Sequence, residues 1–270
     1  VMYKALVMGH GIDGGWVQNF HGNYSSWSSN YPMAPDGTDS GNKQEDAETG
    51  EMVAISRSDL LQEYTRSNVT GVELGDCKNV QFFSCFNILI HTQINLIEDP
   101  YTGGSFDGTM WGFAFDGCHD GIKGESGDAN LTLYESMGVF NQDDRIERGG
   151  YNVNTTEDFT GTISVWNSDS WSPNARGIAY VKGGTVNYVQ GWPWCVFRGE
   201  CFEGGTLNIL GTTFVANNDS RLTVQQAADK WGESVDDMLA LDWVADQGAV
   251  AADDQINIPD AIYYSGSKGK

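Results

Sequence analysis

The sequence is poor in basic residues and in long apolar runs. Its 270 residues include 15 Lys and Arg against 37 Asp and Glu, which gives a formal net charge of -22 at pH 7. A surface this acidic repels nucleic acids and anionic lipid headgroups, so we expect neither as a partner. No stretch of the chain approaches the roughly 18–20 uninterrupted apolar residues of a membrane span. We therefore expect no membrane segment.

Proline is also scarce, with 6 residues, whereas there are 34 glycines and many Asn, Asp, Ser and Thr. This composition favours many tight turns over long helices. The cysteines are odd in number, so at least one has no partner within the chain. They are Cys77, Cys85, Cys118, Cys195 and Cys201. Two close pairs, 77/85 and 195/201, suit small disulfide loops, but cysteine also suits a buried apolar position, and both alternatives stay open.

A short motif recurs in the second half of the chain. Gly-Gly-Thr-Val-Asn-Tyr at 183–188 returns as Gly-Gly-Thr-Leu-Asn-Ile at 204–209, and Gly-Thr-Ile-Ser-Val precedes both at 161–165. The shared Gly-Thr recurs at steps of 23 and then 21 residues. Within each copy apolar and polar residues alternate, as in a strand with one buried face. A fixed step without an intervening helix predicts a coil whose successive turns stack strands into parallel sheets.

Shorter alternations upstream predict further strands in poorer register. They lie at Val72–Leu74, Val80–Phe83, Trp111–Phe115 and Leu131–Leu133. Insertions between strands explain the lost register. The longest insertion, at about 29–50, is nearly devoid of apolar residues, and we expect it to be an exposed loop.

The pattern changes from about residue 222 onward. Val224, Ala227, Ala228 and Trp231 have helical spacing, and a second helical pattern follows Ser234. Thr223 and Ser234 suit the N-cap positions of these two helices. We therefore expect two regions, a β region over 1–212 and a C-terminal helical cap and tail over 213–270 that terminates the repeat.

The turn-rich rungs and the Gly-Gly-Thr repeat resemble the right-handed parallel β-helix superfamily, which includes pectate lyases, polygalacturonase-like glycoside hydrolases and phage tailspikes. The resemblance covers roughly residues 1–212. It implies an all-β fold, namely a right-handed single-stranded parallel β-helix, here with a small C-terminal helical cap.

Two further resemblances lie in the C-terminal region. Thr223–Pro259 looks like a LysM peptidoglycan-binding module without the usual opening strand and turn. Asp253–Ile262 is similar to part of a dockerin calcium loop, and such a loop would hold a structural calcium ion. We expect no cofactor and no other metal site.

Titratable residues cluster at 116–125 and at 141–148. Hydrolysis of a glycosidic bond needs two carboxyl groups that flank it, and neighbouring rungs of a coil would supply them. We take Asp116 and Asp120 as the acid and the base or nucleophile. The full set of catalytic candidates is Asp116, His119, Asp120, Asp143 and Asp144. The alternative interpretation is that these residues form turns and solvated ion pairs.

Aromatic residues gather in and between the best-registered rungs. Aromatic rings pack against sugar rings, while polar side chains bind the hydroxyl groups. The candidates for substrate binding are Trp166, Trp171, Tyr180, Trp192 and Trp194, together with Lys123 and Arg145.

The sequence thus predicts a carbohydrate-active protein that hydrolyses a polysaccharide with a pair of carboxylates. Its alternatives are a non-catalytic glycan-binding or structural β-helix of tailspike or adhesin type, and a polysaccharide lyase. The expected partner is a polysaccharide or a cell-surface glycan, bound by a monomer or a homotrimer. Sequons such as Asn68-Val-Thr and Asn130-Leu-Thr favour an extracellular place or the surface of a virion or cell.

Overall fold

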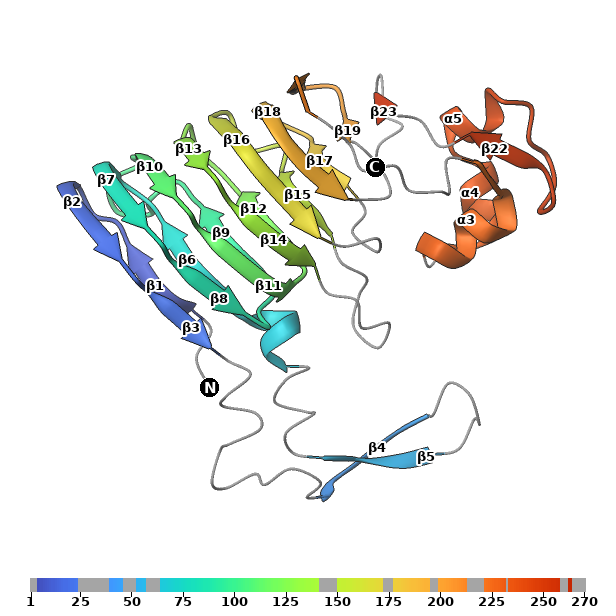
Figure 1. Cartoon of the computed structure of the whole chain (residues 1–270), viewed down its shortest axis with the longest axis horizontal. Coiled ribbons are helices and arrows are strands. Elements are labelled where there is room, and N and C mark those ends of the chain that lie inside the picture. The colour runs from blue at the N-terminus through green and yellow to red at the C-terminus, as the bar shows by residue number, and fades with distance from the viewer. Residues whose placement is uncertain are drawn as a thin grey trace.

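The computed structural model describes residues 4–23, 39–45, 52–56, 64–140, 150–171, 177–194, 199–212, 221–231, 233–257 and 262–263. About half of these residues lie in two large curled sheets of parallel strands (Figure 1). Among the described residues, no helix has both the length and the hydropathy that crossing a membrane requires. The fold is therefore mostly β, as the composition predicted.

The first sheet has eight strands. In spatial order they are β1 (Lys4–Met8), β6 (Thr70–Leu74), β9 (Thr92–Leu96), β12 (Asp120–Gly124), β15 (Tyr151–Thr155), β17 (Gly177–Val181), β19 (Glu200–Cys201) and β23 (Ile262–Tyr263).

The second sheet has eleven strands. Its path runs through β2 (Ile12–Gln18), β7 (Cys77–Phe83), β10 (Asp107–Trp111), β13 (Asn130–Tyr134), β16 (Thr162–Trp171), β14 (Met137–Phe140), β11 (Ala114–Cys118), β8 (Phe86–Ile88) and β3 (His21–Asn23). Off this path, β18 (Gly184–Trp194) pairs with β16 and with β20 (Gly205–Leu210).

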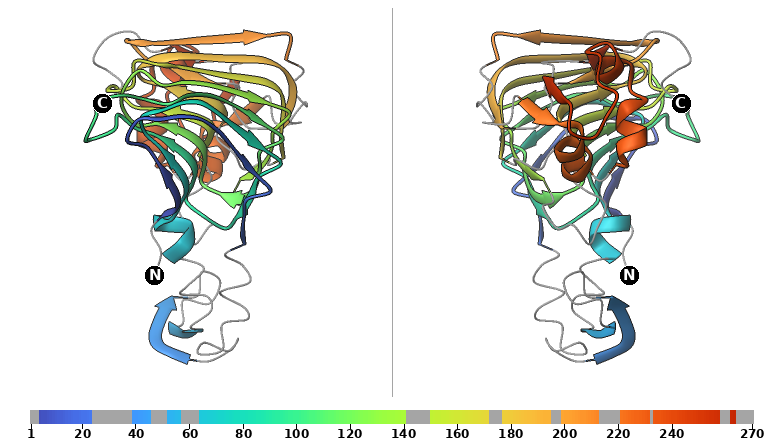
Figure 2. Two further views of the ribbon diagram at one scale, coloured as in Figure 1. Left: turned by 90° about the vertical axis from the view of Figure 1, so that its left-hand side faces the viewer. Right: turned by 90° about the vertical axis from the view of Figure 1, so that its right-hand side faces the viewer.

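The chain visits the two sheets in turn. Each pass, which we call a rung, adds one strand to the eight-stranded sheet and then one or two strands to the eleven-stranded sheet. We call β2, β7, β10, β13, β20 and the beginnings of β16 and β18 the first half of the eleven-stranded sheet. The second half holds β3, β8, β11, β14 and the ends of β16 and β18. Figure 2 shows the two sheets curling around a common interior.

The sequence repeat sets the register of three neighbouring strands. Gly184 and Thr185 of β18 pair with Gly205 and Thr206 of β20, and Thr162 of β16 pairs with Thr185. The predicted stacking of these copies is therefore confirmed. The alternation at 111–115, in contrast, is not one strand. β10 ends at Trp111 and β11 begins at Ala114, because the chain turns a corner between them.

A left-handed residue marks this corner between the two halves in rung after rung. The φ angles there lie between 49° and 62°, at Asn19, Ser84, Gly112, Glu135, Asn167, Gln190 and Gly211. The corner amides also join the rungs: Ser84 N donates to Trp111 O (2.9 Å) and Gly112 N donates to Tyr134 O (2.9 Å). The backbone groups freed by the bend are thus paired between rungs.

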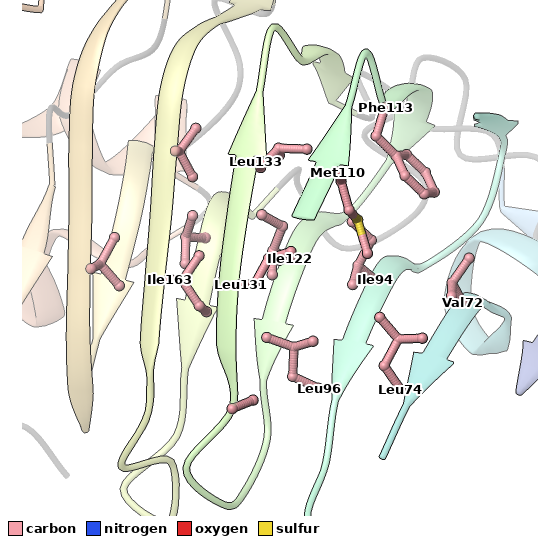
Figure 3. Packing of buried hydrophobic residues seen from close by; sticks show 14 of the residues in the cluster. Val72, Leu74, Ile94, Leu96, Met110, Phe113, Ile122, Leu131, Leu133 and Ile163 are labelled. Atoms are coloured by element: carbon pink, nitrogen blue, oxygen red, sulfur yellow. The ribbon is translucent and has the colours of Figure 1, made fainter. Parts of the chain in front are cut away.

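The core fills the space between the sheets (Figure 3). Val72, Ile94 and Ile122 come from the eight-stranded sheet, while Met110 and Leu133 come from the first half of the eleven-stranded sheet. All are fully buried, so both sheets contribute one apolar face, as the period-2 alternation predicted.

Four cysteines belong to the interior. Cys77, Cys85, Cys118 and Cys201 are buried and form no disulfide. Burial raises the pKa of Cys118 to about 12 and, with Asp76 and Asp99 nearby, that of Cys77 to about 11. They serve as small apolar residues, which decides between the two alternatives for the pair 77/85. Cys195 lies outside the described residues.

The long polar insertion contains a strand. β4 (Asp39–Glu45) pairs antiparallel with β5 (Met52–Ser56), so the expected loop at 29–50 contains one strand of a hairpin whose second strand follows it. The strand was not predicted because its sequence, Asp-Ser-Gly-Asn-Lys-Gln-Glu, has no apolar alternation. The rest of that insertion lies outside the described residues. A short helical turn over 64–68 precedes β6.

The C-terminal unit has its own core. β21 (Arg221–Thr223) pairs antiparallel with β22 (Gln255–Asn257), and between them lie α3 (Val224–Trp231), α4 (Val235–Leu239) and α5 (Asp242–Ala245). Val224, Met238 and Ile256 belong to a buried cluster separate from that of the sheets. After this unit the chain returns to pair β23 with β19.

Both predicted N-caps are confirmed. Thr223 Oγ1 accepts from Gln226 N (3.1 Å), and Gln226 Oε1 accepts in return from Thr223 N (2.9 Å), which is a capping box. Ser234 Oγ accepts from Asp237 N (3.1 Å). The second predicted helix is divided into α4 and α5, because the chain leaves helical geometry at residues 240–241.

Candidate functional site

The residues predicted for catalysis lie on two different sheets. Asp116 is half-buried in β11, in the second half of the eleven-stranded sheet, whereas Asp120 begins β12 of the eight-stranded sheet. A corner with Gly117 at φ 63° separates them. The expected carboxylate pair is therefore not brought to one face of a sheet. Asp143, Asp144 and Arg145 lie outside the described residues.

Asp120 is a buried acceptor of hydrogen bonds. Its Oδ1 accepts from Tyr151 N (3.2 Å) and lies 3.4 Å from His119 Nδ1, and its Oδ2 accepts from Asn154 Nδ2 (3.1 Å). Burial alone would raise the pKa of Asp120, but the bonds and the nearby imidazole outweigh burial and lower it. Asp120 thus has no proton to donate at neutral pH. It orients His119 and joins β12 to β15.

His119 stacks on a second histidine one rung away. The His91 and His119 rings lie 4.7 Å apart at an angle of 6°, each just before a strand of the eight-stranded sheet. His91 Nδ1 lies 2.9 Å from Thr92 Oγ1. Each ring thus has a polar neighbour on its own rung and the other ring stacked against it.

The outer face of the eight-stranded sheet carries a second pair of carboxylates. Asn95 Nδ2 donates to Glu125 Oε2 (2.8 Å) and, at 3.4 Å, to Glu73 Oε2. Because both bonds share one nitrogen, the two Oε2 atoms are at most about 6 Å apart, close enough for the paired carboxylates of a glycoside hydrolase. Sequence reasoning missed this pair, because Glu73 and Glu125 lie in different rungs.

Each of these two carboxylates has a lysine partner. Lys4 Nζ lies 2.6 Å from Glu73 Oε1, and Lys123 Nζ lies 3.2 Å from Glu125 Oε2. Burial would raise the pKa of Glu125, but the bond from Asn95 and the charge of Lys123 outweigh burial and lower it. Glu125 is therefore ionised at neutral pH, where it would act as a base or nucleophile and not as an acid.

Tyr180 lies further along the same face, in an aromatic cluster. Its ring is 5.1 Å from Tyr151 and 4.7 Å from Phe202, and Lys182 Nζ lies 5.6 Å above it. Tyr151 donates through its hydroxyl to Glu200 Oε1 (2.7 Å). Four predicted site residues thus share this face: His119, Asp120, Lys123 and Tyr180.

A row of aromatic side chains crosses the outer face of the eleven-stranded sheet. The aromatic row consists of Phe83, Trp111, Tyr134 and Trp166, one from each of β7, β10, β13 and β16, in direct register. Trp111 stacks on Tyr134 at 4.2 Å and 13°, and Tyr134 lies 6.3 Å from Trp166 at 28°. Trp111 and Trp166 are 42% and 37% exposed, although neighbours such as Met110 are fully buried.

A row of amide and hydroxyl side chains runs beside the aromatic row. The amide row consists of Gln81, Thr109, Thr132, Ser164, Asn187 and Asn208. Asn208 Nδ2 donates to Asn187 Oδ1 (2.9 Å), and Asn187 Nδ2 donates to Ser164 Oγ (3.0 Å). These bonds between rungs fix the side chains, yet both Asn side chains keep further donor and acceptor capacity.

Of the predicted tryptophans, only Trp166 belongs to the aromatic row. Trp192 is 51% exposed on the second half of the sheet, next to buried Pro193. Trp171 and Trp194 lie in β16 and β18, but their side chains are outside the described residues.

Sequence reasoning missed Trp111 and Tyr134 as partners of Trp166. A recurring tripeptide would have found them: Thr109-Met-Trp111, Thr132-Leu-Tyr134 and Ser164-Val-Trp166 each read hydroxyl, buried apolar, aromatic. The spacing between successive copies of this tripeptide is not constant, because residues are inserted between β14 and β15.

Within the part of the chain that the structure describes, no group of three or more His, Cys, Asp or Glu side chains is placed to hold a metal ion. Compared with protein-family models, curated proteins and solved structures, the chain gives no match.

Proposed function

We propose that this chain is a right-handed parallel β-helix that binds an extended polysaccharide on the outer face of its eleven-stranded sheet. The observation that supports this most is the aromatic row beside the amide row. Apolar faces of sugar rings pack against aromatic side chains, and sugar hydroxyls exchange hydrogen bonds with amides and hydroxyls. Because the stacked rings and bonded amides already have fixed positions, little side-chain entropy is lost on binding.

The β-helix assignment accounts for the order and register of the strands. Successive rungs alternate between the same two sheets, neighbouring strands are parallel, and the corner residue recurs at one place in each rung. A chain that coils and stacks like positions on one another has these three properties. This proposal includes the other expectations from the sequence. The protein is of tailspike or adhesin type, it is a monomer or a trimer, and it is extracellular or lies on the surface of a virion or cell.

The C-terminal unit supports an assignment to glycan binding. The opening strand that was not predicted from the sequence is β21, which pairs with β22 and gives the order strand, helices, strand. This brings the unit closer to the LysM modules that it resembles, and that resemblance implies peptidoglycan binding. In this proposal the unit also acts as the helical cap at the end of the coil.

Hydrolysis is the second candidate function. The observation that favours it is the pair Glu73 and Glu125, joined through Asn95. It ranks below binding because both carboxylates have lysine partners, and a glycoside hydrolase needs one protonated carboxyl group. A lyase would instead use a basic residue such as Lys123 on the same face.

Substitution of the aromatic row tests the proposed function. We expect the wild-type chain to bind at least one polysaccharide, and Trp111→Ala combined with Trp166→Ala to weaken binding by about tenfold or more, because two packed rings are lost. The measurement is co-sedimentation with insoluble polysaccharides and affinity electrophoresis with soluble ones. Tyr101→Ala is the control, since this tyrosine is 81% exposed and lies outside both rows.

Equal retention of the double variant and the wild type would contradict binding at this face. The same panel, assayed for reducing ends, tests hydrolysis. Release by the wild type that is lost in both Glu73→Gln and Glu125→Gln would establish the second candidate in place of pure binding.

A further inference from the structure

The faces of the aromatic row are turned toward one another. Trp111 and Tyr134 stack at 4.2 Å, and the ring of Tyr134 is within 28° of that of Trp166. A single sugar that stacks on an aromatic ring needs an open ring face. The inner faces of this row are already covered by the next ring, so the row presents mainly the rims of its rings as one apolar strip.

The aromatic row is one of three parallel rows of outward-facing side chains. A third row, Asp107, Asn130, Thr162, Thr185 and Thr206, runs on the other side of the amide row, and from β10 to β20 the registers contain no shift. Equivalent side chains therefore begin at the same height on every strand. With strands about 4.8 Å apart and alternate residues about 6.6 Å apart, the rows on these five strands cover roughly 19 Å by 13 Å. Such a surface matches another broad surface better than a narrow chain.

The aromatic row and the amide row are uncharged, whereas the third row includes Asp107. The net charge of the chain is -22, yet no residue of the aromatic or amide row is charged, nor are Val189 and Leu210, which continue the aromatic row. The field of the remaining molecule repels polyanions from this face. The rows themselves offer apolar rims and neutral donors and acceptors, which suit an uncharged, hydroxyl-rich ligand.

The spacing of the tryptophans points to a regular ligand. Trp111 and Trp166 lie two strands apart, which corresponds to about 9.6 Å along the stacking direction. This distance is comparable to the repeat of two sugar units in an extended glycan. A solid in which such chains lie side by side would present the same repeat over the whole area of the rows.

We propose that this face binds the surface of a packed, uncharged polysaccharide, a solid of the cellulose or chitin kind, and not a single soluble oligosaccharide. This inference rests on the proposed function, since it names the ligand of the same face. The rims of the aromatic row and the neutral amide row lie against many sugar units at once, and neither salt nor polyanions compete strongly for the contact.

The test compares solid and soluble forms of the same sugar. The full-length chain is mixed with microcrystalline cellulose or chitin, and in parallel with cellohexaose or chitohexaose in a calorimeter. We expect retention on at least one solid, a change of less than about twofold between 0.1 M and 1 M NaCl, and at least tenfold weaker binding of the matching hexasaccharide. Trp111→Ala with Trp166→Ala should lose the retention, whereas Tyr101→Ala should keep it.

Four results would overturn the inference. If a hexasaccharide binds as tightly as the solid, the packed-surface inference fails while the proposed function stands. If only an anionic polysaccharide such as polygalacturonate is retained, the inference that the ligand is uncharged is wrong. If no polysaccharide is retained, the proposed function fails as well. If the double variant instead turns a self-associating chain into a monomer in sedimentation velocity, the face is an interface between copies, and both proposals fail.

Discussion

Asp99 joins the first rungs through backbone amides. It is buried just after β9, and its Oδ2 accepts from His10 N (2.7 Å) while its Oδ1 accepts from Tyr101 N (2.9 Å) and Thr102 N (3.2 Å). Burial would raise the pKa of Asp99, but these bonds, with the His10 imidazole, lower it to about 2. The carboxylate thus ties the turn between β1 and β2 to the loop after β9.

This bond set predicts a pH-dependent loss of stability in acid. The folded-state pKa lies below the unfolded value of about 3.9, so the contribution of Asp99 is fully present above that value and is lost as the pH falls toward 2. We expect Asp99→Asn to lower the melting temperature by a constant amount above pH 5, and the gap to the wild type to narrow below pH 4. Thermal melts of both proteins between pH 2.5 and 7 measure this. A gap that stays constant to pH 2.5 would contradict it.

At the scale of elements, the corner between the halves directly follows the aromatic row. The residue before each corner belongs to the aromatic row or its continuation, and the corner residue takes a left-handed φ, 49° at Asn167 and 56° at Gln190. Corner amides donate across the rungs, as Glu135 N does to Trp166 O (3.0 Å). The corner therefore holds the aromatic row in line.

Substitution of one corner residue tests this role. Asn167→Val places a β-branched side chain at a left-handed φ, and we expect the free energy of unfolding to fall by about 1–2 kcal/mol. Asn167→Gly is the matched control, because glycine adopts this φ without strain. We expect the Asn167→Gly variant to be more stable than the Asn167→Val variant. Urea unfolding measures both. Equal stability of the two variants would show that the corner does not need this conformation.

At the scale of the whole molecule, two cores share one chain. The cluster around Val224, Met238 and Ile256 is separate from the core between the sheets, and the chain returns to the eight-stranded sheet only at β23. A unit with its own core can unfold without disrupting the other. The tie through β23 involves two residues, Ile262 and Tyr263.

Independent unfolding of the C-terminal unit is therefore expected. Met238 is 1% exposed, and Met238→Ala should destabilise this unit by about 2–5 kcal/mol through a lost contact and a cavity. In differential scanning calorimetry one transition should move to lower temperature while the other stays in place. A single transition that shifts as a whole would show instead that the two cores unfold together.

Much of the fold was predictable because buried faces leave a periodic signal. The alternation at 161–212 predicted the strands β16, β18 and β20, and the matching Gly-Thr positions predicted their register. The helices after Thr223 and Ser234 were predicted from apolar spacing and from caps. The strand β4 was missed because its sequence has no apolar alternation, and the corner within 111–115 was missed because it depends on a left-handed φ at Gly112.

The candidate site was predictable only in part. His119, Asp120, Lys123 and Tyr180 do share one face, but Asp116 lies on the other sheet and Asp120 already accepts hydrogen bonds from Tyr151 N and Asn154 Nδ2. Outward residues have no apolar constraint, so their spacing seldom marks which of them meet. The recurring tripeptide that ends in Trp111, Tyr134 and Trp166 is such a mark, whereas no repeat links Glu73 to Glu125. Glu73 and Glu125, and equally Trp111 and Trp166, come together only when the rungs are aligned.

The Gly-Gly-Thr repeat, the turn-rich composition and the charge of the chain determined by themselves that the protein is β-rich, stacked and acidic. Burial of apolar surface sets the alternation of apolar and polar residues within each strand, so this alternation can be recognised in the sequence. Only the tertiary structure decided that an aromatic row and a neutral amide row lie side by side. Because the rungs differ in length, equivalent residues are not evenly spaced along the sequence. The pairing of parallel strands places them side by side in the structure.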